Sequence, residues 1–453
     1  MNICILVPVC SRNQSYSSIE EIPFFKNLYP SFEKTKDKGY NYTFFIGYDD
    51  DDVFYNENAH KFGEIKTFRL EGCQHAPATA WNKLAKIAYD DSVNYDYFFQ
   101  IGDDVTLETP GWTTKFINRL SSNNNLGVVG PCYLANYYGR VNNGTQYVIE
   151  NAFVSRKHLD IFGYFFHPNI KNWFCDDWMT RIYDKIFCEI QVDYTCQNTI
   201  LGSRYNTINI KSEIQTYINE GKLILQNHNK VFSYCVYGSQ KKYCLGMIKN
   251  LEQIEKLFPG YRVVIYLGND VPQEYIEKYN SYHFVTLIYH DFTGGRLMAY
   301  RFLVFDLNYD VAFVRDADSR FGDRDIWCIN HFLNSEYKVF TIRDHPWHGR
   351  ELMAGQTGIK KIEGLNIKEK LEQYIRIKET PDCYQNDQDF IIPAIFYQYK
   401  NTVISYAEFY YFGEKQTIKI PVPRKSSEDF CGNVFLFDED NNEYTEFTIY
   451  GKK

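Results

Sequence analysis

Short runs of apolar residues alternate with helical patterns through the first half of the chain. Four of these runs have the length and composition of buried strands: Ile3–Val9, Tyr42–Ile46, Tyr97–Ile101 and Gly127–Val129. A helix is expected over residues 78–89, where Trp81, Leu84 and Ala88 share one face, and another over residues 112–120. Strands that alternate with helices predict a mixed, mostly parallel sheet with helices covering it.

The same alternation restarts after a polar stretch at residues 226–230. Strands are predicted at Phe232–Tyr237, Arg262–Leu267, Phe284–Ile288 and Val311–Arg315, and helices over residues 245–258 and 295–305. The halves show no obvious sequence repeat, yet each gives strand, helix, strand, helix and a strand that ends in acids. We therefore expect two α/β domains of one fold class, residues 1–228 and residues 229–453.

Composition narrows the class of protein. The 453 residues exceed the ~100–200 that are usual for one domain, and the 18% of aromatic residues argue for ordered, densely packed structure. The net charge of −8 and the lack of a Lys/Arg run argue against nucleic acid as a partner. No apolar stretch approaches the ~20 residues of a membrane span. The 12 scattered cysteines, without Cys-x-x-Cys pairs, favour reduced thiols and a cytoplasmic location.

Two predicted strands stop abruptly at carboxylates: residues 97–101 lead to Asp103 and Asp104, and residues 311–315 lead to Asp316 and Asp318. Open α/β sheets bind ligands at the carboxyl ends of their strands. Solvated turn residues are the simpler explanation for a lone pair of acids, but each pair here ends a strongly apolar strand in the middle of its domain. Because neighbouring carboxylates repel, a partly buried pair requires a cation or a raised pKa. A divalent cation such as Mn²⁺ or Mg²⁺ would complete its shell with water and the phosphate oxygens of a nucleoside-diphosphate sugar.

The first half offers a division of roles around such a donor. Asp103 and Asp104 would hold the metal. Asp176 and Asp177, near the start of a helix expected over residues 177–187, would deprotonate an acceptor hydroxyl or would only cap that helix. A separate general base favours inversion at the anomeric carbon. The candidate donor contacts of this half are Pro8, Arg12, Asn13, Asp49, Asp50 and Asp103.

In the second half, Asp316 and Asp318 stand two residues apart, a spacing that lets both face one cation. Asp387 and Gln388 precede a helix expected over residues 390–399, where they would bind sugar hydroxyls or cap the helix. The segment 354–358 is expected to be flexible and to let backbone approach a ligand.

Basic residues supply the other candidates of this half. His345 and His348 have the spacing of a metal pair, but Pro346 lies between them, which favours substrate or phosphate contacts over a transition metal. For the arginines, phosphate binding competes with ordinary surface ion pairing. The candidate donor contacts of the second half are Arg296, Arg301, Arg315, Asp316, Arg343, His345, Asp387 and Gln388.

At these residues the first half resembles a GT-A-fold glycosyltransferase, of the tandem kind found in large DNA viruses. The matching motifs are Asp49-Asp50-Asp51-Asp52, Trp81-Asn82, Phe98–Asp104, Gly111-Trp112, Gly127–Pro131 and Asn172–Trp178. The resemblance implies a GT-A fold, a nucleotide-sugar donor and a divalent metal at Asp103 and Asp104. A viral source would place the protein in the host cytoplasm.

The second half is similar to a GT-A-like family whose D-x-D loop carries donor and metal. The matching motifs are Arg315–Arg320, Arg343–Pro346, Ala354-Gly355, Asp387–Phe390 and Pro421–Arg424. Two departures from the family stand out. Gln356-Thr357-Gly358 replaces a bulkier Met-Trp-Gly-like run, and no late histidine completes the metal shell, which leaves Asp318 as the surer ligand.

The leading hypothesis is a metal-dependent glycosyltransferase, a hexosyl- or deoxyhexosyltransferase with two catalytic domains that acts on a glycan or glycoprotein acceptor. The alternative keeps one domain catalytic and makes the other a glycan- or nucleotide-binding module. A kinase or nucleotidyltransferase would need a glycine loop with lysine, which the sequence lacks. A carbohydrate-binding protein without catalysis fits the many aromatic residues.

Overall fold

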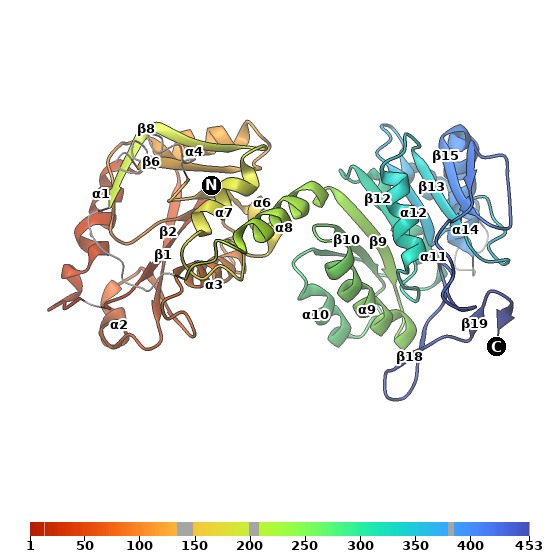
Figure 1. The fold of residues 1–453 in the computed structure, drawn as a ribbon, viewed down its shortest axis with the longest axis horizontal. Helices are drawn as coiled ribbons and strands as arrows, with labels where there is room; N and C mark the ends of the chain where they lie inside the picture. Colours follow the sequence, from red (N-terminus) through yellow and green to blue (C-terminus); the bar gives the residue numbers. More distant parts are fainter. Residues whose placement is uncertain (13, 134–147, 199–207, 379–384, 453) are drawn as a thin grey trace. The chain divides into compact units, whose positions relative to one another are not determined.

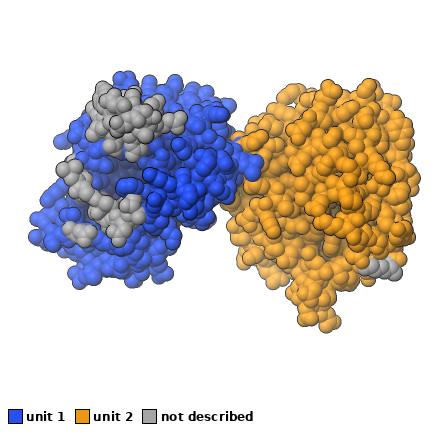
Figure 2. Space-filling model, in the orientation of Figure 1, with its two compact units in different colours: residues 1–225 blue, residues 226–453 orange. Residues whose placement is uncertain are grey.

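The computed structural model describes residues 1–452 except 13, 134–147, 199–207 and 379–384. The chain forms two compact units, Met1–Leu225 and Gln226–Lys453, which Figure 2 colours separately. The division falls in the last turn of helix α8 (Ile214–Asn227), at 225/226, whereas the sequence placed it at 228/229. Among the residues that the structure describes, no helix is long and apolar enough to cross a bilayer.

Unit 1 is built on an eight-stranded mixed sheet (Figure 1). In spatial order its strands are β3 (Lys66–Leu70), β2 (Asn41–Asp49), β1 (Asn2–Val9), β4 (Tyr97–Gln100), β7 (Phe153–Ser155), β6 (Val128–Tyr133), β8 (Cys188–Asn198) and β5 (Val105–Leu107). The first four strands are parallel, and β7 is antiparallel to both of its neighbours. Strand β8 is parallel to β6, and β5 is antiparallel to β8. The carboxyl ends of β1, β2 and β4 therefore meet at one edge of the sheet.

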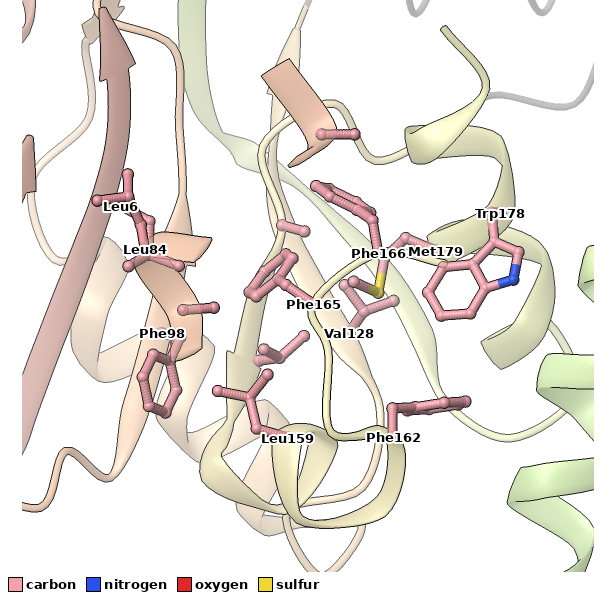
Figure 3. Packing of buried hydrophobic residues seen from close by; sticks show 14 of the residues in the cluster. Leu6, Leu84, Phe98, Val128, Leu159, Phe162, Phe165, Phe166, Trp178 and Met179 are labelled. Carbon is pink, nitrogen blue, oxygen red and sulfur yellow. The ribbon is translucent and has the colours of Figure 1, made fainter. Parts of the chain in front are cut away.

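Helices cover both faces of this sheet. They are α1 (Tyr29–Thr35), α2 (Val53–Asn58), α3 (Pro77–Tyr89), α4 (Trp112–Ser121), α6 (Arg156–Phe162), α7 (Cys175–Tyr183) and α8. Because side chains alternate along a strand, Ile3, Ile5 and Val7 of β1 pack with α1, α2 and α4. Cys4 and Leu6 point to the other face, where they pack with α3, α6, α7 and α8. Figure 3 shows part of this second core.

Unit 2 is built on a second eight-stranded sheet. In spatial order its strands are β11 (Val285–Tyr289), β10 (Arg262–Leu267), β9 (Lys230–Val236), β12 (Val311–Arg315), β14 (Gln356–Lys360), β13 (Val339–Arg343), β15 (Val403–Ala407) and β16 (Gln416–Ile418). Its principal helices are α9 (Lys241–Leu257), α10 (Gln273–Asn280), α11 (Gly295–Tyr300), α12 (Asp323–Leu333), α13 (Ile367–Ile377) and α14 (Asn386–Ile391). Two short strand pairs end the chain: β17 (Leu436–Phe437) with β18 (Glu443–Tyr444), and β19 (Phe447–Thr448) with β20 (Gly451–Lys452).

The two sheets share one topology over seven of their eight positions. In each, four parallel strands are followed by an antiparallel strand, a strand antiparallel to that one, and a strand parallel to the last. Strand β12 of unit 2 therefore occupies the position of β4 in unit 1. The eighth position differs, because β5 is antiparallel to β8 whereas β16 is parallel to β15. The prediction of two α/β domains with mixed, mostly parallel sheets is confirmed.

One local prediction was wrong, and two predicted helices differ from the structure in type or in bounds. The segment expected to be flexible forms buried strand β14, which pairs with β12 and β13 in the middle of the sheet. The helix expected over residues 295–305 changes from α-helix to 3-10 helix at Arg301. The helix expected over residues 177–187 is α7, which begins two residues earlier and ends at Tyr183.

Burial of His158 makes the stability of unit 1 depend on pH. The Nε2–H of this buried ring donates to the carbonyl of Phe165 and Nδ1 accepts from the hydroxyl of Tyr183, both at 2.9 Å, and burial lowers its pKa from 6.5 to about 4. Unfolding restores the ordinary pKa, so the unfolded state binds the extra proton between these values. We expect stability to be complete above pH 6.5 and to fall towards pH 4 by at most about 3 kcal/mol.

Hydrogen exchange of the α6 and α7 amides, corrected for the intrinsic rate at each pH, measures this loss. The variant His158→Gln should be less stable at pH 7.5 and should change less between pH 7.5 and pH 5. An equal pH dependence in the two proteins would contradict the assignment.

Candidate active site

The acids Asp103 and Asp104 form the centre of a β-turn that follows the central strand β4. The amide of Val105 donates to the carbonyl of Gly102 at 3.3 Å, which closes the turn and starts β5. Asp103 is completely buried, whereas Asp104 is half-buried. A fully buried carboxylate is unusual for a residue whose only function is to make a turn.

A cavity of about 550 Å³ lies at the carboxyl ends of β1, β2 and β4. This size is in the range of ~300–1,000 Å³ that is typical of ligand sites. The cavity brings together most of the first-half candidates, namely Pro8, Arg12, Asp49, Asp103, Asp104, Asp176 and Asp177. Asp50 does not line it and instead accepts a 2.7 Å hydrogen bond from Gln74. Asn13 lies outside the described residues.

Arg12 carries positive charge into the acidic end of β2. Its guanidinium lies 2.6 Å from Asp49 and 3.0 Å from Asp51. Burial raises the pKa of Asp49, and the Arg12 charge offsets part of this rise. Asp52 fixes the loop before Arg12, since it accepts from both the amide and the hydroxyl of Ser11 while capping α2. The fourth acid of the Asp49–Asp52 run is therefore structural.

Helix α7 is oriented by the residues that follow its two acids. Trp178 and Met179 are completely buried, and the indole Nε1–H of Trp178 donates to the carbonyl of Tyr217 at 2.9 Å (Figure 3). With these side chains in the core, Asp176 and Asp177 lie in the first turn and line the cavity. Asp176 accepts the backbone N–H of Asp177 at 3.0 Å.

Some motif residues of unit 1 make hydrogen bonds that hold the scaffold. The Trp81 indole donates to the carbonyl of Leu6 at 3.1 Å, which ties α3 to β1. Asn82 accepts from the amides of Phe165 and Phe166 and donates to the carbonyl of Phe166. These bonds shape the loop that brings Phe166 to the cavity wall.

Sequence reasoning missed several residues that line the cavity: His75, Gln100, Glu150, Asn151 and Trp173. The side-chain oxygen of Gln100 accepts the backbone N–H of Ala152, and the backbone N–H of Gln100 donates to the carbonyl of Ala152, both at 2.9 Å. The position of Gln100 therefore depends on the pairing of β4 with β7. Strand β7 has only three residues, too few to give a periodic signal. Gln100 and Trp173 lie inside the quoted motifs Phe98–Asp104 and Asn172–Trp178, which were the available signals.

The donor set of unit 1 fits a hard divalent cation. Asp103 and Asp104 offer only oxygen, the ligand type that Mn²⁺ and Mg²⁺ prefer. Among the described residues, no three His, Cys, Asp or Glu side chains converge as a metal site would require. A cation held by Asp103 and Asp104 would therefore need further oxygens from a phosphate group and from water.

The equivalent turn of unit 2 is held by buried polar contacts. The amide of Ser319 donates to the carbonyl of Asp316 at 3.3 Å. The carbonyl of Ala317 accepts from Asn250 and Arg320, both at 3.0 Å. A Cβ on Gly246 would lie 2.6 Å from that carbonyl, so glycine permits the close approach of α9 to the turn.

Arg301 joins the acids of unit 2. Its guanidinium lies 2.5 Å from Asp316 and 2.5 Å from Asp387, and it also donates to the carbonyl of Arg315. Asp318 is buried, and its burial together with the charge of Asp316 raises its pKa to about 6. Gln388 accepts from the amide of Ala354 and donates to the carbonyl of Leu352. The structure thus brings Arg301, Asp316, Asp318 and Asp387 into one cluster.

Four other second-half candidates make contacts within the fold. Arg315 lies 2.7 Å from Asp325 in a buried ion pair. Arg343 is completely buried against Glu414. His345 is buried, and its Nε2 lies 2.9 Å from the carbonyl of Thr448 in β19. This contact holds the C-terminal strand pair against the rest of unit 2. Arg296 lies over the ring of Phe292.

Neither a family model nor a curated protein sequence matches this chain. Solved structures with partial similarity include galactosyltransferase LgtC with donor and acceptor sugar analogues (10% identity, TM-score 0.29, 39% of this chain and 73% of that one). Others are mannosyltransferase PcManGT from Pyrobaculum calidifontis with GDP-Man and Mn²⁺ (11%, 0.29, 44% and 58%) and TarS from S. aureus (11%, 0.31, 49% and 39%). Each similarity covers less than half of this chain, and the chain spans between 39% and 73% of those proteins.

Gly355 tests how tightly the unit 2 cluster is packed. A Cβ at this position would overlap the carboxylate of Asp316, so we expect Gly355→Ala to displace Asp316 from Arg301. The cost should be about 1–3 kcal/mol in the stability of unit 2, as for other overpacked sites. Hydrogen exchange of β12 and β14 measures it.

Gly349→Ala is the matched control, because a Cβ there would lie 3.6 Å from the nearest atom, in the ring of Tyr410, which is ordinary contact. Equal exchange rates in the two variants would show that Asp316 is not held as described.

Proposed function

We propose that unit 1 is a metal-dependent glycosyltransferase that transfers a sugar from a nucleoside-diphosphate sugar to a glycan or glycoprotein acceptor. The observation that carries the proposal is one cavity lined both by the acid turn after β4 and by the acids of α7. The first group suits a cation and a diphosphate, and the second suits a hydroxyl that must lose its proton. Arg12 and the end of β1 lie in the same cavity and would contact the nucleotide.

The residues of unit 1 then divide the reaction between them. Asp103 and Asp104 would hold the cation, which neutralises the charge on the diphosphate when it is bound. The acceptor oxygen bonds to the anomeric carbon, while the bond from that carbon to the diphosphate oxygen breaks and its electron pair leaves on the diphosphate. The hydroxyl proton passes to the carboxylate of Asp177. This single displacement inverts the anomeric configuration.

We further infer that unit 2 binds a second donor and is a catalyst of the same class. The shared strand order places Asp316 and Asp318 at the turn that follows β12, the counterpart of β4. The cluster of Arg301, Asp316, Asp318 and Asp387 offers one cationic and three anionic groups for a metal, a phosphate and sugar hydroxyls. The second candidate function for unit 2 is binding without transfer. It is favoured by the contact of Arg301 with Asp316, which occupies one oxygen of a proposed metal ligand.

Ligand-induced stabilisation tests the donor and the metal. We expect one nucleoside-diphosphate sugar, among UDP-, GDP- and dTDP-sugars, to raise the melting temperature of the whole chain, and manganese to increase the rise. A ligand at 100 times its Kd adds about 2.7 kcal/mol to stability. Asp104→Asn should remove the manganese-dependent part of the rise in melting temperature that comes from donor binding to unit 1. A melting temperature that no donor changes, with or without manganese, would exclude the proposed activity.

The general base is tested by Asp177→Asn. We expect kcat for transfer to fall by about 10²–10⁴, with donor affinity unchanged, because only proton transfer is removed. Asp184→Asn is the matched control: Asp184 ends the same helix, where it pairs with Lys222 at the surface. If both variants keep the full kcat, then Asp177 is a helix cap.

Separate Asp104→Asn and Asp318→Asn variants test whether unit 2 is an independent enzyme. Two active units should give two transfer reactions, each lost in one variant only, when donors and products are compared by mass spectrometry. Loss of every transfer reaction through Asp104→Asn alone would assign unit 2 to binding.

A further inference from the structure

The segment before α7 presents an exposed indole at the cavity of unit 1. Trp173 lines the cavity, and 53% of its surface is accessible to solvent. It precedes Asp176 and Asp177 by three and four residues. A ligand that enters the cavity can therefore contact this indole.

The position of Trp173 is fixed by the buried side chain of Asn172. The Asn172 amide donates to the carbonyl of His75 at 3.1 Å, and its oxygen accepts the backbone N–H groups of Trp173 at 2.7 Å and Ile208 at 3.2 Å. A backbone bond of 3.0 Å from Ala78 to Lys171 joins the same two segments. The segment that carries the indole is therefore anchored to the loop that starts α3.

Backbone strain lies on both sides of this anchor. His75 and Phe174 line the cavity with φ of 57° and 73°, in the left-handed region that bulky side chains disfavour. Such residues cost about 1–3 kcal/mol each and are found at ligand clamps. The strain at Phe174 sets the turn that exposes Trp173 while Trp178 stays in the core.

The chemistry of the indole limits what it can bind. Its faces are apolar and uncharged, so it suits neither a diphosphate nor a cation hydration shell, for which the cavity has Asp103, Asp104 and Arg12. A pyranose ring, in contrast, has an apolar face of C–H groups and a rim of hydroxyls. Stacking on Trp173 would leave those hydroxyls within the same cavity as Asp177.

We propose that Trp173 is the platform of an acceptor-sugar subsite, which binds a neutral pyranose ring and positions its hydroxyl for Asp177. The inference rests on the proposed function of unit 1 and names the side of the reaction on which Trp173 acts. Trp173 is a specificity-determining residue: it sets the KM for the acceptor and leaves donor binding unchanged.

Saturation-transfer NMR on the whole chain tests this subsite with simple probes: methyl β-glucoside, methyl β-galactoside and methyl α-mannoside, in the presence of UDP, GDP or dTDP and manganese. In the wild-type protein we expect saturation of the ring C–H protons of at least one glycoside. Trp173→Ala should weaken the binding of that glycoside by about tenfold, because one stacking contact is lost. Trp173→Phe should keep most of the affinity. Tyr397→Ala is the matched control, since Tyr397 is a 62% exposed aromatic residue of unit 2.

The outcomes separate this inference from the proposed function. If a nucleotide sugar stabilises the chain but Trp173→Ala binds the glycosides as tightly as the wild type, the subsite is wrong and the transferase proposal stands. Binding of no glycoside by a wild-type chain that binds donor overturns the subsite in the same way. A change of oligomeric state in Trp173→Ala, measured by sedimentation, would assign the indole to a protein interface instead. Failure of every donor to bind is the separate failure of the proposed function.

Discussion

The structure depends on the burial of a carboxyl group at the carboxyl end of a central parallel strand. Strand β4 is buried along its whole length, and Asp103, in the turn that follows it, is completely buried. A buried carboxylate is tolerated only with compensating partners, because desolvation of an ion costs several kcal/mol. The parallel neighbours β1 and β2 end at the same edge, so Arg12 and Asp49 are brought to the same cavity by topology alone. The geometry of the site is thus a consequence of strand direction.

Half of the strands of unit 1 were predicted from local sequence: β1, β2, β4 and β6 were expected, whereas β3, β5, β7 and β8 were not. The apolar run of β4 followed by two acids, the loop after β1 and the helix with Trp178 on its buried side all carry short-range signals, and their residues meet in the cavity. The antiparallel strands β7 and β14 were missed for physical reasons. Strand β7 has only three residues, too few to show the alternation of apolar and polar positions that predicts a strand. Strand β14 contains the polar residue Gln356, whose side chain is buried against Arg315 at 3.5 Å, and Arg315 is distant in sequence.

Charge pairing in unit 2 could not be read from sequence because the partners are far apart along the chain. Arg343 and Glu414 are 71 positions apart, and Arg301 and Asp387 are 86 positions apart. The sequence gives an arginine two explanations, a phosphate contact or an ion pair, and only the folded neighbours decide between them. For Arg315 and Arg343 the neighbours are buried carboxylates, while for Arg301 they are the acids of the candidate site itself.

The two units hold the same acid turn by different means. In unit 1 the turn leads directly into β5, whose pairing with β8 fixes it through backbone bonds. In unit 2 the chain instead enters α12, and two buried ion pairs adjoin the turn: Arg301–Asp387 and Arg315–Asp325. Removing one member of such a pair leaves a buried charge and costs about 3–5 kcal/mol. Replacement of Asp325 would therefore leave the buried Arg315 without its partner carboxylate, whereas Asp318 belongs to neither of these pairs.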